Sequence, residues 1–351
     1  VISAVDGNVT FNSTGVGASN IGISVYGETQ IGASGSGNVI VETDGVWLTN
    51  GPDQQVLGGE TSTGDVTFVV AGFERSAPSQ GLLIETSGNV TIHDTDKALR
   101  SNFDLSFLNV SSHVNDLSVD HASGAGNIVL GNAIAVAGDM TFKAAGVDVP
   151  VNLMVGGTLT FNGAASVTNT ATFTANGFFG AAIDLNANTL TIADSGTGSV
   201  TGIISGNGSL ITSGTGTLTL SGASTYSGGT TVSTGTLKAG ASSTGSVTNG
   251  PFGTGTVTVS NGASLDVNGQ TIANALSVQG AGVSSAGVVF NSVASEASLD
   301  GAVTLAGDTT IKSTAGGDLT FGGAVDGAYA LTVASDADVT FEVAVGANTT
   351  L

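Results

Sequence analysis

Most of the side chains that could do chemistry lie in the N-terminal third of the chain. They are three histidines, four aspartates and three of the six basic residues: His93, His113, His121, Asp94, Asp96, Asp116, Asp120, Arg75, Lys97 and Arg100. Imidazole nitrogens and carboxylate oxygens can hold a metal ion, but no two histidines have the HExxH spacing typical of a zinc site. We therefore interpret residues 72–123 as less regular coils with solvated charges, and we predict no metal ion, no cofactor and no catalytic residue. If any part of the chain binds a ligand, this segment is the candidate.

Two other groups of residues allow a functional interpretation. Asp194–Gly196 reads DSG, as in the nucleophile segment of secreted serine proteases, but Ala193 stands where that segment has glycine, so we expect a turn. Four aromatic residues could stack on sugar rings at the surface, or on one another between coils in the interior, which is the commoner arrangement. These are Trp47, Phe178, Phe179 and Tyr226.

The composition is that of a folded chain with a one-sided charge balance. The 351 residues are 40% hydrophobic and 9% charged, unlike disordered chains, which combine low hydrophobicity with high charge. The 27 acidic and 6 basic residues give a net charge of −21, so we expect neither nucleic acid nor an anionic membrane surface as a partner. No apolar run approaches the roughly 18 residues that span a bilayer, so we predict no direct membrane insertion.

A five-residue phrase recurs along the chain. Each copy has a turn residue, a polar residue, an apolar residue, threonine and a second apolar residue. The copies are Gly7–Phe11, Gly64–Phe68, Gly88–Ile92, Gly138–Phe142, Gly157–Phe161, Asn188–Ile192, Gly216–Leu220, Gly255–Val259, Gly317–Phe321 and Ala337–Phe341. Neighbouring copies begin 19 (Gly138 to Gly157), 20 (Gly317 to Ala337) or 24 (Gly64 to Gly88) residues apart. Because the two apolar positions are two residues apart, they lie on one face of a strand, which indicates one buried and one wet face.

A unit of about 20 residues is too short to form its own core, but successive units can share one by stacking. We therefore predict an all-β fold, a parallel β-helix (β-solenoid) with coils about 4.8 Å apart. Val, Leu, Ile and Phe fill its interior, Thr and Ser lie outside, and Gly or Asn takes the corners of positive φ. We expect Leu218, Leu220, Val232 and Leu237 to point inward and Ser227–Gly229 to turn a corner.

Residues 205–240 carry a more specific pattern. Its parts are GTLTL at Gly216–Leu220, STYSGGTT at Ser224–Thr231 and GTL at Gly235–Leu237. This pattern resembles the passenger-associated repeat of bacterial autotransporters, and Gly250–Gly269 resembles the segment that follows it in that family. The tail Gly307–Val333 resembles repeats of large haemagglutinin-like surface adhesins. These resemblances imply a right-handed parallel β-helix on a bacterial surface or secreted from it, and they do not imply an activity.

Three classes of function fit this interpretation. The first, which we favour, is a non-catalytic extracellular structural or adhesive rod that presents or spaces binding regions and assembles into a filament or layer. The second is a carbohydrate-active β-helix enzyme or polysaccharide-binding module, which would need several Asp, Arg or Lys at equivalent positions of adjacent coils. The third, an ice-binding or small-ligand solenoid, would need a regular flat array of threonines.

The organisation and partners follow from the repeats. We predict that residues 1–351 form one continuous β-helix and are a segment of a longer protein, since neither end reads as a cap. A coil at an open end exposes unpaired strand edges and apolar side chains. We therefore expect other copies or flanking β-helix segments as partners, with cell-surface glycans or other cells as further candidates.

Overall fold

The computed structural model describes residues 114–121, 127–313 and 317–346 and, before them, residues 65–70, 89–94 and the other strands given below. Side chains are described at residues 65–68, 89–93, 114–121, 128–313 and 317–346. The chain divides into two compact units, Val1–Thr174 and Ala175–Leu351.

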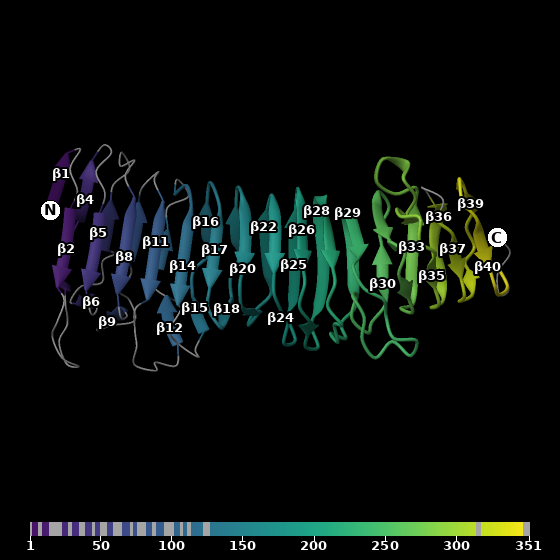
Figure 1. The fold of residues 1–351 in the computed structure, drawn as a ribbon, viewed down its shortest axis with the longest axis horizontal. Helices are drawn as coiled ribbons and strands as arrows, with labels where there is room; N and C mark the ends of the chain where they lie inside the picture. The colour runs from purple at the N-terminus through teal and green to yellow at the C-terminus, as the bar shows by residue number, and fades with distance from the viewer. Residues whose placement is uncertain are drawn as a thin grey trace. The chain divides into compact units, whose positions relative to one another are not determined.

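The first unit consists of short strands (Figure 1). They are β1 (Ile2–Val5), β2 (Val9–Ser13), β3 (Ile23–Tyr26), β4 (Gln30–Ser34), β5 (Val39–Thr43), β6 (Val46–Thr49), β7 (Gln55–Gly58), β8 (Val66–Val70), β9 (Phe73–Arg75), β10 (Leu82–Glu85), β11 (Val90–Asp94), β12 (Asn102–Leu105), β13 (Leu108–Val110), β14 (Leu117–His121), β15 (Asn127–Leu130), β16 (Ile134–Val136), β17 (Met140–Lys143), β18 (Gly146–Asp148), β19 (Leu153–Val155), β20 (Thr158–Phe161), β21 (Ala164–Ser166) and β22 (Ala171–Ala175).

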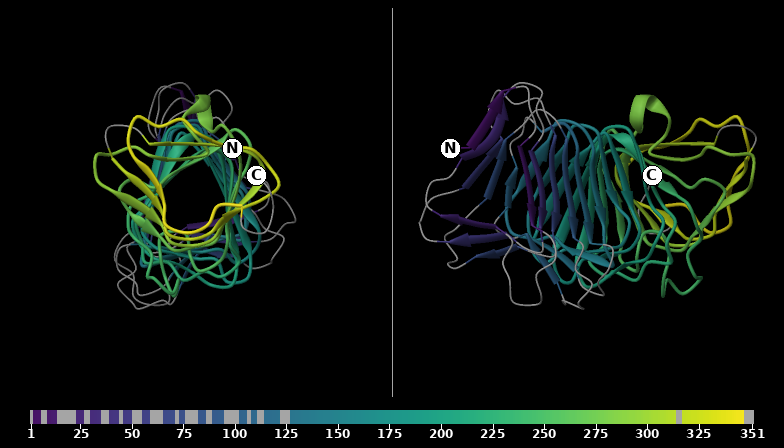
Figure 2. Two further views of the ribbon diagram at one scale, coloured as in Figure 1. Left: turned by 90° about the vertical axis from the view of Figure 1, so that its right-hand side faces the viewer. Right: turned by 60° about the vertical axis from the view of Figure 1, so that its left-hand side comes forward.

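The second unit has the same organisation, with three longer strands, β28, β29 and β36. Its strands are β23 (Gly177–Gly180), β24 (Ile183–Asp184), β25 (Thr189–Asp194), β26 (Thr197–Val200), β27 (Ile204–Ser205), β28 (Ser209–Leu220), β29 (Thr230–Ala239), β30 (Val257–Val259), β31 (Ala263–Asp266), β32 (Thr271–Ile272), β33 (Leu276–Gly280), β34 (Val289–Asn291), β35 (Ala297–Leu299), β36 (Val303–Ser313), β37 (Leu319–Phe321), β38 (Val325–Asp326), β39 (Leu331–Val333) and β40 (Val339–Phe341). A single turn of 3-10 helix, η1 (Val283–Ser285), is the one helical element among the described residues, and Figure 2 shows it as the short green coil outside the strands.

Successive turns of the chain pair in parallel within each unit. Met140 of β17 lies beside Leu159 of β20, and Leu190 of β25 lies beside Leu210 of β28, so neighbouring turns are about 20 residues apart. The last three residues of every copy of the five-residue phrase lie in a strand. The predicted all-β fold, a parallel β-solenoid with about 20 residues per coil, is confirmed.

The interior is built from the apolar positions of the phrase. In the first unit one buried column crosses five turns in register, because each strand presents the same position inward: Phe68, Ile92, Val119, Phe142 and Phe161. The rings of Phe142 and Phe161 are stacked with centroids 5.3 Å apart. In the second unit Leu218, Leu220, Val232 and Leu237 are all buried, as predicted. The alternation of β-branched and aliphatic residues with small polar ones therefore determines which face of each strand is inside.

The corners use residues that tolerate positive φ. Gly229, which ends the predicted corner Ser227–Gly229, has φ of 83°, and Asn186 has φ of 51°. Residues other than glycine and asparagine rarely adopt a positive φ. The Gly/Asn turn pattern of the sequence therefore follows from the backbone conformation of the corners. Within the described part of the chain, we find no helix with the length and apolar character needed to cross a bilayer.

Candidate functional site

The histidine-bearing turns bring one predicted pair of residues together. His93 of β11 is in register with Asp120 of β14, and its Nδ1 lies 3.4 Å from Asp120 Oδ2. Both side chains are partly exposed, at 40% and 26%. Lys143 of β17 continues the same outward row. His121 belongs to the opposite face of β14 and is buried.

This row contains one surface ion pair, between His93 and Asp120. Among the described side chains, no three His, Asp or Glu residues are grouped so that they could hold a metal ion. An exposed pair such as His93 and Asp120 contributes about 1 kcal/mol or less, and only while the imidazole is protonated. Other members of the sequence-based cluster lie outside the described residues or are described by their backbone alone. His113, Asp96, Lys97 and Arg100 are outside, and Asp94 and Arg75 are described as strand residues of β11 and β9.

Asp116 has a structural use that the sequence interpretation missed. Its Oδ1 accepts a hydrogen bond of 2.7 Å from the backbone N–H of Asp139, one turn further on. Asp139 Oδ1 in turn accepts one of 2.7 Å from the N–H of Thr158, and Asp65 Oδ1 accepts one of 2.8 Å from Asn89. In these turns an aspartate just before the inward-facing strand positions therefore links one corner to the next. The recurrence of aspartate directly before the first apolar strand residue was the sequence signal that could have predicted these bonds.

The DSG segment forms a corner between β25 and β26. Ser195 Oγ donates to the carbonyl oxygen of Ala175 and to Asn176 Oδ1, each at 3.3 Å, so both of its contacts lie along the preceding turn. Asp194 is 4% exposed, and its Oδ1 accepts the N–H of Gly196 at 3.0 Å. Burial raises the pKa of Asp194, although the nearby backbone N–H groups of Gly196 and Phe178 partly offset this. The expected turn is observed.

The aromatic residues divide between the interior and the surface. Phe178 and Tyr226 are buried, whereas Phe179 is 40% exposed. Trp47 is described only as a backbone residue of β6. Phe142 and Phe161 are also buried, and their rings stack on each other. The interior is therefore the usual place for aromatic rings in the described turns.

Tyr226 explains the TYSGGT part of the sequence pattern. Its hydroxyl lies 2.5 Å from Thr230 Oγ1, and Thr230 Oγ1 donates to the carbonyl oxygen of Phe252 at 3.1 Å. Since Thr230 uses its proton on Phe252, the tyrosine hydroxyl is the donor to Thr230. Burial raises the pKa of Tyr226. The pair therefore connects two turns of the interior through neutral hydrogen bonds.

A second network lies at the other end of β29 and contains a buried carboxylate. Lys238 Nζ is 3.3 Å from Asp266 Oδ2. Ser292 donates to Asp266 from its Oγ at 2.7 Å and from its backbone N–H at 3.2 Å, and the N–H of Asn268 donates at 3.0 Å. Lys238, Asp266 and Ser292 come from three successive turns, so the network fastens these turns to one another.

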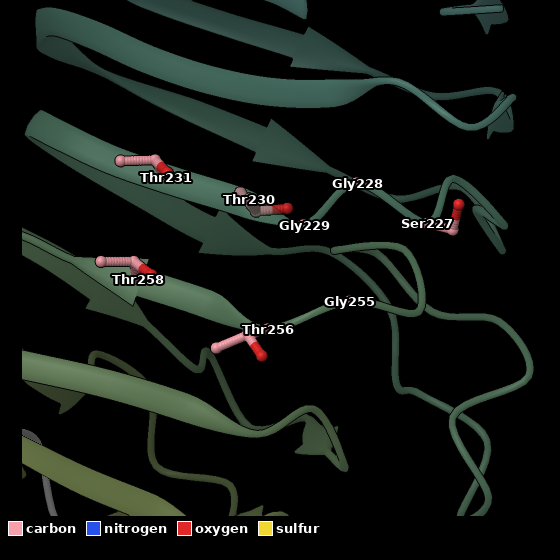
Figure 3. A pocket seen from close by; sticks show the side chains of 8 residues that line it. All are labelled: Ser227, Gly228, Gly229, Thr230, Thr231, Gly255, Thr256 and Thr258. Atoms are coloured by element: carbon pink, nitrogen blue, oxygen red, sulfur yellow. The ribbon is translucent and has the colours of Figure 1, made fainter. Parts of the chain in front are cut away.

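The outer surface of the same repeat carries a polar groove, shown in Figure 3. It has a volume of about 420 Å³. The lining consists of hydroxyl-bearing residues and glycines: Ser227, Gly228, Gly229, Thr230, Thr231, Gly255, Thr256 and Thr258. The sequence interpretation missed this groove, because its residues read as turn and strand positions.

Comparison with known families locates the repeat. Residues 210–239 match the model of the passenger-associated-transport-repeat family. The match runs from β28 to the last residue of β29 and so covers the Tyr226 corner and the Gly229 turn. Searches of curated proteins and of solved structures gave no match.

The fold and the matched repeat together define the class of protein. The chain is a β-helical repeat protein that contains one passenger-associated-transport-repeat, at residues 210–239. The resemblance of residues 205–240 to the passenger-associated repeat is thereby confirmed. The resemblance of Gly307–Val333 to haemagglutinin-like adhesins stays a prediction.

Proposed function

We propose that this chain is a non-catalytic structural segment of a bacterial passenger protein, which spaces or presents binding regions outside the cell. The observation that carries the proposal is the use of polar groups in the described turns. Asp116, Asp139, Thr230 and Asp266 all bond from one turn to another. Such groups serve to hold a stack in register, and a scaffold needs no further chemistry.

The passenger repeat supports a surface or secreted location, because passenger domains are the exported parts of autotransporters. An adhesive role and assembly into a layer or filament belong to the same proposal. They are supported by large apolar side chains that are exposed along the described turns, namely Met154 at 59%, Ile203 at 49% and Phe179 at 40%. Side chains of this kind are suited to contact with a second copy or another partner.

Labelling of intact cells tests the location. Antibodies against the purified 351-residue chain should label the surface of unpermeabilised cells of the source bacterium, and immunogold particles should follow the cell envelope or material beyond it. Labelling that requires permeabilisation would contradict the proposal.

Turnover assays test the enzyme alternative. The row of His93, Asp120 and Lys143 places titratable side chains of both signs in register on three adjacent turns. We expect no polysaccharide cleavage by the purified chain. Cleavage that is lost in Asp120→Asn and kept in Asp308→Asn, an exposed carboxylate elsewhere, would replace the scaffold with the enzyme.

A further inference from the structure

We infer that the groove beside the Gly229 turn binds a short, uncharged, hydroxyl-rich glycan. This inference goes beyond the proposed scaffold role and does not depend on it, since the groove belongs to the second unit alone. It rests on the residues that form the groove, the hydrogen-bonding groups around it and the charge of its walls.

The outward row beside the groove contains one residue without a side chain, Gly229. Leu210 N–H donates to Gly229 O, and Thr230 N–H donates to Thr256 O, which places Gly229 between Ser209 and Thr256 on successive turns. Its neighbours in this row carry hydroxyl side chains, while Gly229 has none. Gly228 and Gly255 also line the groove (Figure 3), and they let the backbones of the corner approach closely, since a Cβ would lie 2.5 Å from Gly208 O at Gly228 and 2.7 Å from Gly229 Cα at Gly255. The groove volume of about 420 Å³ is within the range of small-ligand sites.

The walls offer hydrogen-bonding groups that the described part of the protein does not use. The hydroxyls of Thr231, Thr256 and Thr258 have no hydrogen-bond partner among the described residues, and Figure 3 shows all three beside the groove. The backbone N–H groups of Gly229 and Gly255 likewise donate to no backbone acceptor in that part of the chain. Hydroxyls both donate and accept, and N–H groups donate, so the groove can satisfy the mixed hydrogen-bonding needs of sugar hydroxyls.

The charge of the walls selects against ionic ligands. None of the eight lining residues is ionisable. The chain as a whole carries 27 acidic and 6 basic residues, so its field repels anionic polysaccharides. A cation would find no carboxylate in the lining to pair with. An uncharged glycan is the ligand class that these walls accept.

Binding can be measured with defined probes. The full chain should bind at least one of the uncharged trisaccharides of glucose, mannose and N-acetylglucosamine in saturation-transfer NMR, with titration giving the dissociation constant. A trisaccharide of glucuronic acid is the charged control and should not bind. The double variant Thr231→Val, Thr258→Val keeps β-branched side chains on the strands and removes two hydroxyls. We expect it to weaken binding about tenfold, as for two lost hydrogen bonds.

A matched variant separates the groove from the general surface. Thr191 and Thr304 occupy the same outward row as Thr231 and Thr258, but they do not line the groove. Thr191→Val with Thr304→Val should leave binding unchanged, whereas Thr256→Glu in the groove should abolish it. The inference is overturned if none of the three uncharged probes binds at its solubility limit. Equal weakening by both double variants, or tighter binding of the glucuronic acid probe, would overturn it as well.

Discussion

Two buried carboxylates in the second unit end their strands in the same way and have opposite surroundings. Asp194 is the last residue of β25 and Asp266 the last residue of β31, and they are 4% and 3% exposed. Asp266 receives hydrogen bonds from Ser292 and Asn268 and an ion pair from Lys238. Asp194 Oδ2 has no hydrogen-bond partner among the described residues.

The difference shows how a narrow solenoid can use polar residues in its corners. A buried carboxylate with a full set of partners holds turns together, and its removal leaves several groups unpaired. A buried carboxylate with a free oxygen costs stability while it is ionised, because the desolvated charge is incompletely compensated. We therefore expect substitution of Asp266 to lower the free energy of unfolding and substitution of Asp194 to raise it.

The largest effect is expected at Asp266. Asp266→Ala removes the partner of Lys238 and the acceptor of Ser292 and Asn268, so we expect a loss of about 3 kcal/mol in the free energy of unfolding. Urea unfolding followed by circular dichroism measures it. Asp308→Ala is the matched control, because Asp308 is exposed and accepts one backbone hydrogen bond from Ala330. A loss at Asp266 no larger than that at Asp308 would remove the distinction between the two carboxylates.

Substitution of Asp194 should raise the free energy of unfolding by an amount that depends on pH. Because the folded-state pKa is raised above its ordinary value, the carboxyl group favours folding when it is protonated. This contribution is fully present below the ordinary aspartate pKa and is lost as pH rises through the raised value. Asp194→Asn should therefore be about 1 kcal/mol more stable than the natural chain at neutral pH, with the gain shrinking in acid. Urea unfolding of both chains at a series of pH values tests this, and a gain that is largest in acid would contradict the sign.

Removal of the buried, neutral hydroxyl of Tyr226 should change the free energy of unfolding by an amount between those for Asp266 and Asp194. Tyr226→Phe removes the donor to Thr230, while Thr230 keeps its own bond to Phe252. We expect a loss of about 1 kcal/mol in the free energy of unfolding. Tyr329→Phe should cause no change, since Tyr329 is 46% exposed. Losses of equal size in the two variants would mean that the buried hydroxyl contributes nothing specific.

The smallest effect is expected at Thr212. This residue is buried between Ile192 and Val232 of the adjacent turns, and its Oγ1 has no hydrogen-bond partner among the described residues. Thr212→Val keeps the shape and removes the unpaired hydroxyl, so we expect a gain of about 0.5 to 1 kcal/mol in thermal or urea unfolding. A loss would indicate that the hydroxyl has a partner, such as a bound water.

The sequence predicted the repeating parts of this molecule better than the contacts between them. Inward positions such as Phe142 and Leu220 follow from the period of two within each strand, which local sequence determines. The Asp266 network joins residues 26 to 28 positions apart, in turns of unequal length, so no local pattern places Lys238 beside it. The same limit applies to the pairing of His93 with Asp120 and to the hollow at Gly229, which depend on the register between turns.

Register between turns is the central claim, and cysteine pairs test it directly, because the natural chain has no cysteine. Ser277 and Thr304 are in register on adjacent strands, β33 and β36. Cysteines at these two positions should form a disulfide on mild oxidation, since neighbouring strands lie about 4.8 Å apart, within the Cα separations that disulfides allow. Thr258 lies in the same row one turn earlier, so cysteines at 258 and 304 should stay reduced within the monomer. Mass spectrometry after thiol labelling should find the 277–304 pair oxidised and the 258–304 pair free, and the reverse result, or equal oxidation of both, would contradict the stacked solenoid.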